Sequence, residues 1–175
     1  MKVFNILILL ICHTLTLCSH NTTAENEEKE IHIVLDEWHK AAATADFEAY
    51  FSMMTPDAVF IGTDATENWQ YEEFKAFSKP YFDSGKAWSF TSVERHIYID
   101  ESLKTAWFDE LLDTRMKLCR GSGVLKKVNR RWKIAHYVLS IAIPNDDVEK
   151  VVDIKEKSDN ALLKKLTEKP RKINR

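Results

Sequence analysis

The strongest constraint on the fold is a change of periodicity near residue 87. From there the sequence alternates between inward and outward side chains, and aromatic and β-branched residues dominate. Four such segments cover roughly residues 88–100, 105–114, 117–127 and 131–143, joined by turn-rich stretches at 100–102 and 128–130. Because the connections are short, the segments are predicted to form antiparallel hairpins. The second half of the domain is therefore predicted to be a sheet whose apolar face must be buried by other elements.

The residues before this change have helical spacing. A first amphipathic helix is predicted from a stripe of apolar residues: Ile31, Val34, Leu35, Trp38, Ala42 and Ala45. Asp46 is expected to cap a short second helix that ends before Thr55-Pro56, and residues 58–61 are typical of a short buried strand. A third helix carries Phe74, Phe77 and Tyr81 in one row and is expected to stop near Pro80 and Gly85. This order predicts an α+β protein in which a curved, mostly antiparallel sheet wraps around about three helices.

The two ends of the chain differ from its middle. Lys2 precedes an apolar run over residues 3–11, which predicts a signal peptide at 1–24 with cleavage near residues 18–24, and hence export to a periplasm or out of the cell. The run is too short to span a membrane, so no transmembrane segment is expected in the mature chain. Lipid anchoring at Cys18 is an alternative, weakened by the bulky Leu17 before it. A folded domain at 27–144 and a basic, partly helical tail at 145–175 complete the predicted organisation, the tail helix beginning at a capping box formed by Asp146 and Glu149.

Composition and motifs exclude several classes. A net charge of −2 and a pI of about 6.3 argue against nucleic acid as a partner. No Walker loop, dinucleotide fingerprint or nucleophile elbow is present, so no cofactor is expected. Cys119 stands alone in the folded part, where it is expected to be a small buried hydrophobe.

Three sequence segments resemble SnoaL-like domains of the nuclear transport factor two-like superfamily. They are residues 62–67, the run Trp107-Phe108-Asp109-Glu110, and residues 132–137 with Ser140 after them. The resemblance covers about residues 30–144 and implies a conical fold around one pocket, commonly dimerised through the outer surface of the sheet. Members include polyketide cyclases, ketosteroid isomerase relatives, dehydratases and a kinase association domain, so the resemblance fixes no reaction. The Tyr and Asp pair of ketosteroid isomerase has no counterpart that can be located.

Candidate functional residues lie on the predicted strands. Alternation places Trp132, Ile134, His136, Val138 and Ser140 on one face, which predicts that His136 points into the cone as a proton acceptor, a ligand contact or a satisfied core histidine. Asp109 and Glu110 are adjacent, so one of the two is expected to face inward, with Arg120 on the neighbouring strand as its cation. This pair is interpreted either as a catalytic acid or as a buried ion pair that fixes the register of the sheet.

Other candidates carry a weaker signal. Asp64 lies in a loop where capping is the default role and the pocket rim the alternative. Trp69 and Trp107 are predicted to supply aromatic wall, together with Trp88. His32, Asp36 and His39 have a spacing that could present metal ligands, but a solvated stripe is the preferred interpretation and no metal is expected.

Three hypotheses follow. The first is an exported protein that binds an apolar or aromatic small molecule through Asp64, Trp69, Trp107, Glu110, Arg120 and His136. The second is an enzyme of the isomerase, cyclase or dehydratase type, with His136, Asp109 and Glu110 as candidates for proton transfer. The third is a dimeric interaction module.

Overall fold

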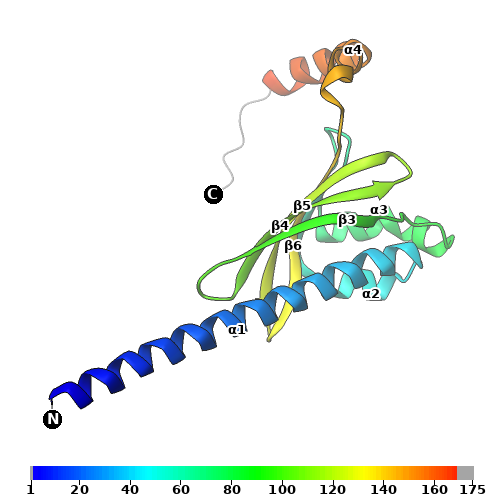
Figure 1. The fold of residues 1–175 in the computed structure, drawn as a ribbon. Coiled ribbons are helices and arrows are strands. Elements are labelled where there is room, and N and C mark those ends of the chain that lie inside the picture. The colour runs from blue at the N-terminus through cyan, green and yellow to red at the C-terminus, as the bar shows by residue number, and fades with distance from the viewer. Residues whose placement is uncertain (1, 169–175) are drawn as a thin grey trace. The chain divides into compact units, whose positions relative to one another are not determined.

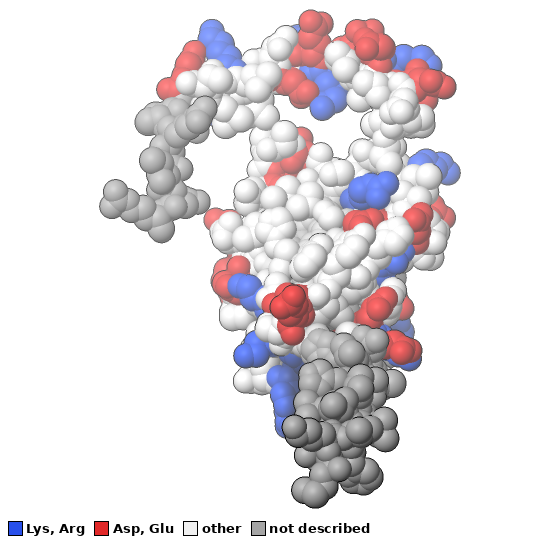
Figure 2. Space-filling model, turned by 60° about the vertical axis from the view of Figure 1, so that its left-hand side comes forward, with Lys and Arg blue, Asp and Glu red and all other residues white. Residues whose placement is uncertain are grey.

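The computed structural model describes the backbone of residues 2–168 and the side chains of residues 23–168 (Figure 1). The chain divides into two compact units, the first ending at Ile141 and the second beginning at Ala142. No helix of the described residues is long and apolar enough to cross a membrane. On the face in view in Figure 2, acidic and basic side chains are interspersed, in keeping with the small net charge.

The first unit contains helices and one sheet. Its helices are α1 (Lys2–Ala43), α2 (Phe47–Ser52) and α3 (Tyr71–Asp83), and its strands are β1 (Met54–Ile61), β2 (Asn68–Gln70), β3 (Thr91–Ile99), β4 (Thr105–Thr114), β5 (Lys117–Val128) and β6 (Arg131–Ile141). The sheet has six strands in the order β2-β1-β6-β5-β4-β3, in which β1 runs parallel to β6 and every other pair is antiparallel. The three helices lie along one side of the curved sheet (Figure 1). The predicted α+β architecture is therefore confirmed.

The inner stripe of α1 packs against the sheet as its spacing predicts. Ile31, Leu35, Trp38 and Ala42 are buried. The helix ends where Ala45 adopts a positive φ of 54°, and the next helix begins at once because the backbone N–H of Ala49 donates to the Asp46 carboxylate at 3.0 Å. The predicted cap is thus present.

Two local predictions about the helical half are wrong. Helix α3 ends at Asp83, between Pro80 and Gly85 as predicted, but its buried row is Phe74, Ser78 and Phe82 rather than the predicted one. Phe77 and Tyr81 remain exposed, so these two rings do not contribute to the core. Strand β1 begins earlier than expected and includes Pro56, which lies where the pairing between β1 and β6 shifts its register.

The last strand contains a β-bulge at Ala135. Val124 pairs with His136, but the next residue, Leu125, pairs with Ile134, so Ala135 is the extra residue. The bulge reverses the alternation: Trp132 and Ile134 face inward before it, and Tyr137 and Leu139 face inward after it. His136 therefore faces the outer side of the sheet, and its predicted place inside the cone is wrong.

The second unit consists of a short 3-10 helix (Asn145–Asp147) and α4 (Val148–Thr167). The predicted helical tail is present, but its capping box is not formed. Asp147 occupies the N-cap position and makes no capping hydrogen bond with its side chain.

Candidate functional site

The carboxylate of Glu110 is the centre of a buried polar group. Alternation along β4 turns Ala106, Phe108, Glu110, Leu112 and Thr114 inward, and Glu110 is 0% exposed. Its Oε1 lies 2.8 Å from Nε2 of His39 and accepts a hydrogen bond from the Tyr137 hydroxyl at 3.3 Å. Its Oε2 accepts a hydrogen bond from Nε of Arg95 at 2.9 Å. Residues from α1, β3, β4 and β6 thus meet at one carboxylate.

Arg95 connects this carboxylate to the first helix. Its Nη1 donates to Asp36 at 2.8 Å and to the backbone oxygen of His32 at 3.4 Å. Its Nη2 lies 2.9 Å from the Glu110 carboxylate, at an angle that leaves that N–H without an aligned acceptor. The side chain is only 4% exposed, so the guanidinium is held between α1 and the sheet. We call Glu110, His39, Arg95 and Tyr137 the Glu110 cluster.

Electrostatics in the Glu110 cluster keep the carboxylate ionised. Burial alone would raise the pKa of Glu110, but the hydrogen bond from His39 and the charges of His39 and Arg95 together lower it below its ordinary value. The pKa of the Tyr137 phenol is raised well above its ordinary value, chiefly by burial and then by the neighbouring Glu110 charge. At neutral pH the cluster is an ion pair with a neutral phenol beside it.

Gly121 provides the room for this arrangement. It pairs directly with Glu110 across the β4–β5 ladder. A methyl group at residue 121 would lie 2.4 Å from the Tyr137 hydroxyl and 3.0 Å from Cγ of Glu110. The absence of a side chain at this position therefore lets the phenol approach the carboxylate.

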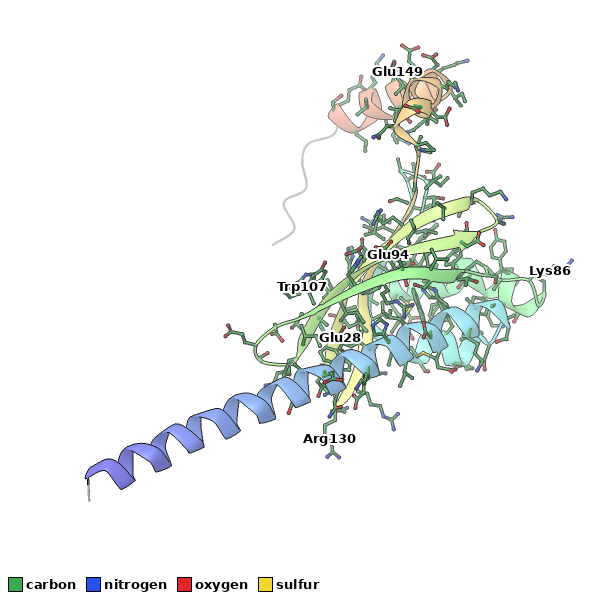
Figure 3. All side chains as sticks on the ribbon, viewed as in Figure 1. Glu28, Lys86, Glu94, Trp107, Arg130 and Glu149 are labelled. Carbon is green, nitrogen blue, oxygen red and sulfur yellow. The ribbon has the colours of Figure 1, made fainter. Side chains whose placement is uncertain are left out.

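The structure does not bring the predicted site residues together. Glu110 faces inward, whereas Asp109 and Arg120 lie on the outer face, where Nη1 of Arg120 is 3.6 Å from the Asp109 carboxylate. The predicted pairing of Glu110 with Arg120 is wrong because Arg120 pairs with Leu111, while Arg95 on the other neighbouring strand lies opposite Glu110. Trp107 is 48% exposed and stacks on Tyr98, projecting away from α1 (Figure 3).

A cavity of about 770 Å³ opens beside the cluster. Its walls come from the β1–β2 loop, α3, the α3–β3 connection, and the turn between β4 and β5. Aromatic side chains dominate the lining: Phe60, Trp69, Phe74, Phe77, Tyr81, Trp88 and Phe90. The ring of Trp69 stacks on Phe77 with centroids 4.7 Å apart, and the ring of Phe60 stacks on Phe74 at 4.1 Å. Trp69 on β2 lines this cavity, whereas Asp64, in the β1–β2 loop, does not.

A layer of rings separates the cavity from the Glu110 cluster. Phe90 lines the cavity and its ring lies 5.9 Å from that of His39, and Phe60 lines it with its ring 5.5 Å from that of Tyr137. Glu110, His39 and Tyr137 do not themselves line the cavity. The ionised carboxylate is therefore shielded from a molecule that binds there.

His32, Asp36 and His39 on α1 form neither the metal site nor the solvated stripe that their spacing suggested. His32, Asp36 and His39 do not form a solvated stripe, because His39 is 5% exposed and all three contact Arg95 or Glu110. Among the residues whose side chains the structure describes, no group of three or more His, Cys, Asp or Glu is placed to hold a metal ion.

Comparison with known proteins identifies the fold. The family model of the SnoaL-like domain matches residues 31–144. No curated protein matches the chain. Similar solved structures include a nuclear transport factor two-like protein of unknown function from Pseudomonas putida, with 13% identity and a TM-score of 0.57 over 67% of this chain and 88% of that one.

Two further solved structures share the fold. A candidate dehydratase of the same superfamily from Streptomyces avermitilis has 12% identity and a TM-score of 0.60, covering 69% of this chain and 99% of that one. A candidate calcium/calmodulin dependent protein kinase II association domain from Xanthomonas campestris has 19% identity and a TM-score of 0.51, covering 66% and 87%. At these identities the likeness concerns the fold alone.

Proposed function

Because the chain belongs to the SnoaL-like domain family, whose fold supports unrelated functions, we propose a function from its cavity: it binds a small aromatic or apolar molecule there. The observation that carries the proposal is a pair of exposed rings inside a concave wall. Phe77 and Tyr81 are 37% and 48% exposed, although both line the cavity. Aromatic surface left uncovered in a cavity favours a ligand that covers it.

The size of the cavity fits this function. About 770 Å³ falls within the roughly 300–1,000 Å³ of pockets that enclose small organic ligands. The lining also carries polar side chains, and among them Thr63, Ser89 and Thr91 could orient a ligand by hydrogen bonds. Native mass spectrometry of the protein purified from its source tests the proposal, with an adduct of small-molecule mass expected on the wild type and lost in a variant with Trp69→Ala and Phe77→Ala. Purification in an empty state, combined with no binding of aromatic probes, would contradict it.

A second candidate function is catalysis of isomerisation, cyclisation or dehydration. It is supported by a carboxylate, an imidazole and a phenol within hydrogen-bonding distance of one another, and by the likeness to a candidate dehydratase. Binding is favoured over this function because Glu110 is ionised, fully bonded and behind a layer of rings. A Tyr137→Phe variant that loses turnover of a bound ligand while keeping its affinity would favour the enzyme instead.

Pairing with a second copy of the chain is part of the proposal. Tyr98, Trp107 and Leu118 are 46–48% exposed on the outer face of the sheet. Exposed apolar side chains gathered on one sheet face are typical of protein interfaces. The likeness to a candidate association domain supports self-association, without indicating the surface.

We also propose that the protein is exported by cleavage of its first residues. The apolar run after Lys2 supports removal of residues 1–24 and release to a periplasm or to the exterior. Glu27 lies just after this boundary. It accepts a hydrogen bond from Nε1 of Trp132 at 2.7 Å and forms an ion pair with Lys127. The domain therefore needs its chain from about residue 27 onward, which fits cleavage upstream of it.

A further inference from the structure

We propose that the molecule in the cavity is an aromatic compound that carries an anionic group, and that Arg115 binds this group. The inference rests on the proposed binding function and adds the charge of the ligand to it. It depends on which of the charged residues in the lining are free to meet a ligand. Two carboxylates, Glu67 and Asp113, and two cations, Lys86 and Arg115, line the cavity.

The two carboxylates are directed elsewhere. Glu67 folds back onto its own loop, where it accepts the backbone N–H of Asp64 at 3.2 Å and lies directly against Gly62. Asp113 stands between Leu112 and Thr114, which both face inward, so its side chain is on the outer side of the sheet. Asp113 thus faces away, and Glu67 is already engaged through one oxygen, so the carboxylates are less free than the cations to meet a ligand.

The cations remain without partners. Neither Lys86 nor Arg115 has an ion pair among the side chains that the structure describes, and both are exposed. Figure 3 shows Lys86 extending from the α3–β3 connection away from the domain. Arg115 lies in the tight turn between β4 and β5. Because Lys86 extends away from the domain, Arg115 is the lining cation that we assign to the ligand.

The turn holds Arg115 at the rim of the cavity. Oγ1 of Thr114 accepts the backbone N–H of Met116 at 2.9 Å and donates to the backbone oxygen of Lys117 at 2.9 Å. These two bonds fix the turn on either side of Arg115, and Met116 lines the same cavity. Because the turn is already fixed, the backbone of Arg115 loses little freedom when a ligand binds. Its guanidinium can hold a carboxylate or sulfonate through two parallel hydrogen bonds. The rings of Trp69, Phe77 and Tyr81 would meet the aromatic body of the ligand.

Two fluorescent probes with the same ring skeleton test the inference. The probe 8-anilinonaphthalene-1-sulfonate carries a negative charge, and N-phenyl-1-naphthylamine is its neutral counterpart. In titrations of the full-length mature protein, the anionic probe is expected to bind about tenfold more tightly than the neutral one, the gain typical of one charge-assisted contact. Arg115→Gln should remove this preference and leave the affinity for the neutral probe unchanged.

The control variant is Arg131→Gln, which removes an exposed arginine at the start of β6, away from the cavity lining. It should keep the preference for the anionic probe. Equal affinities of the two probes for the wild type, or a preference that survives Arg115→Gln, would overturn the anionic ligand and leave the binding function standing. Failure of both probes to bind would overturn the binding function as well.

Discussion

At the scale of single residues, the stability of the fold is most sensitive to substitutions around one buried charge. Glu110 is an ionised carboxylate with no exposure to water, and its stability depends on His39, Arg95 and Tyr137. Taking one partner away leaves an uncompensated charge in the core. The ion pair between Asp109 and Arg120 on the outer face also joins a carboxylate to a guanidinium. Solvent reaches this pair, and exposed ion pairs contribute little to the free energy of unfolding.

The two arginines therefore form a matched pair of tests. Arg95→Leu should lower the free energy of unfolding by about 3–5 kcal/mol, because it strands the buried carboxylate. That is a large share of the roughly 5–15 kcal/mol of an ordinary domain. Arg120→Leu, which breaks an exposed pair, should change it by less than about 1 kcal/mol. Urea denaturation of both variants checks this, and equal losses would mean that the Glu110 cluster does not carry the stability assigned to it.

The pH dependence of stability has a definite sign at Glu110. Its pKa in the folded chain lies below the ordinary value of 4.5, so its contribution is fully present above that value and is lost as the pH falls through the folded pKa. The free energy of unfolding should therefore decrease below about pH 4.5, and Glu110→Gln should flatten that decrease while lowering stability at neutral pH. Glu101→Gln, in an exposed turn, is the control. An acid limb unchanged by Glu110→Gln would contradict the assignment.

At the scale of secondary-structure elements, the sequence predicts the strands but not their exact register. Periodicity located all four strands of the second half, and it correctly left one of Asp109 and Glu110 facing inward. It could not show the extra residue at Ala135, because a bulge leaves each side of the strand with a normal alternating pattern. The bulge shifts the alternation of β6 by one residue, so Tyr137 rather than His136 lies on the inner face.

The cation of Glu110 was missed for a related reason. Both neighbouring strands offer an arginine, and the choice between them depends on the registers of the two hairpins. The turn between β3 and β4 pairs Ile99 with Ala106, and counting back from that pair sets Arg95 opposite Glu110. The short turn after Asp100 was a signal for this register. His39 carried no such signal, since its contact spans elements distant in the chain.

The bulge makes a prediction about His136. Because this imidazole lies on the outer face beside Val124, His136→Gln should change neither ligand capture nor stability by more than about 0.5 kcal/mol. Tyr137→Phe should cost more, since it removes a hydroxyl that donates to Glu110 in the core. Thermal denaturation beside a probe-binding assay measures both effects. A large loss of binding in His136→Gln alone would place the imidazole in the site after all.

At the scale of the whole molecule, the outer sheet face predicts a homodimer. Sedimentation should show a dimer at micromolar concentration, and a chain ending at Pro144 should remain dimeric because the proposed interface is the outer face of the sheet. Trp107→Lys should yield a monomer, since it introduces a charge into the exposed apolar face. Lys104→Gln, in the β3–β4 turn, is the control. A wild-type protein that sediments as a monomer would contradict this use of the surface.

Processing of the chain is the second prediction at this scale. N-terminal sequencing of the exported protein should find a first residue between 18 and 25, which retains Glu27 and its bonds to Trp132 and Lys127. A chain starting at residue 31 should be less stable than one starting at residue 25, because it loses these half-buried contacts. A mature protein that keeps residues 2–17 would remove the proposal of export by cleavage.

The central claim, that the aromatic cavity binds a small molecule, can be tested through the tryptophans. The chain has five, and each gives one indole N–H signal in a ¹H–¹⁵N spectrum. Trp69 and Trp88 line the cavity, whereas Trp107 lies on the outer face. Titration with N-phenyl-1-naphthylamine, with signals assigned by Trp→Phe variants, should shift the signals of Trp69 and Trp88 and leave that of Trp107 in place. A spectrum in which Trp107 moves while Trp69 and Trp88 do not would contradict the account.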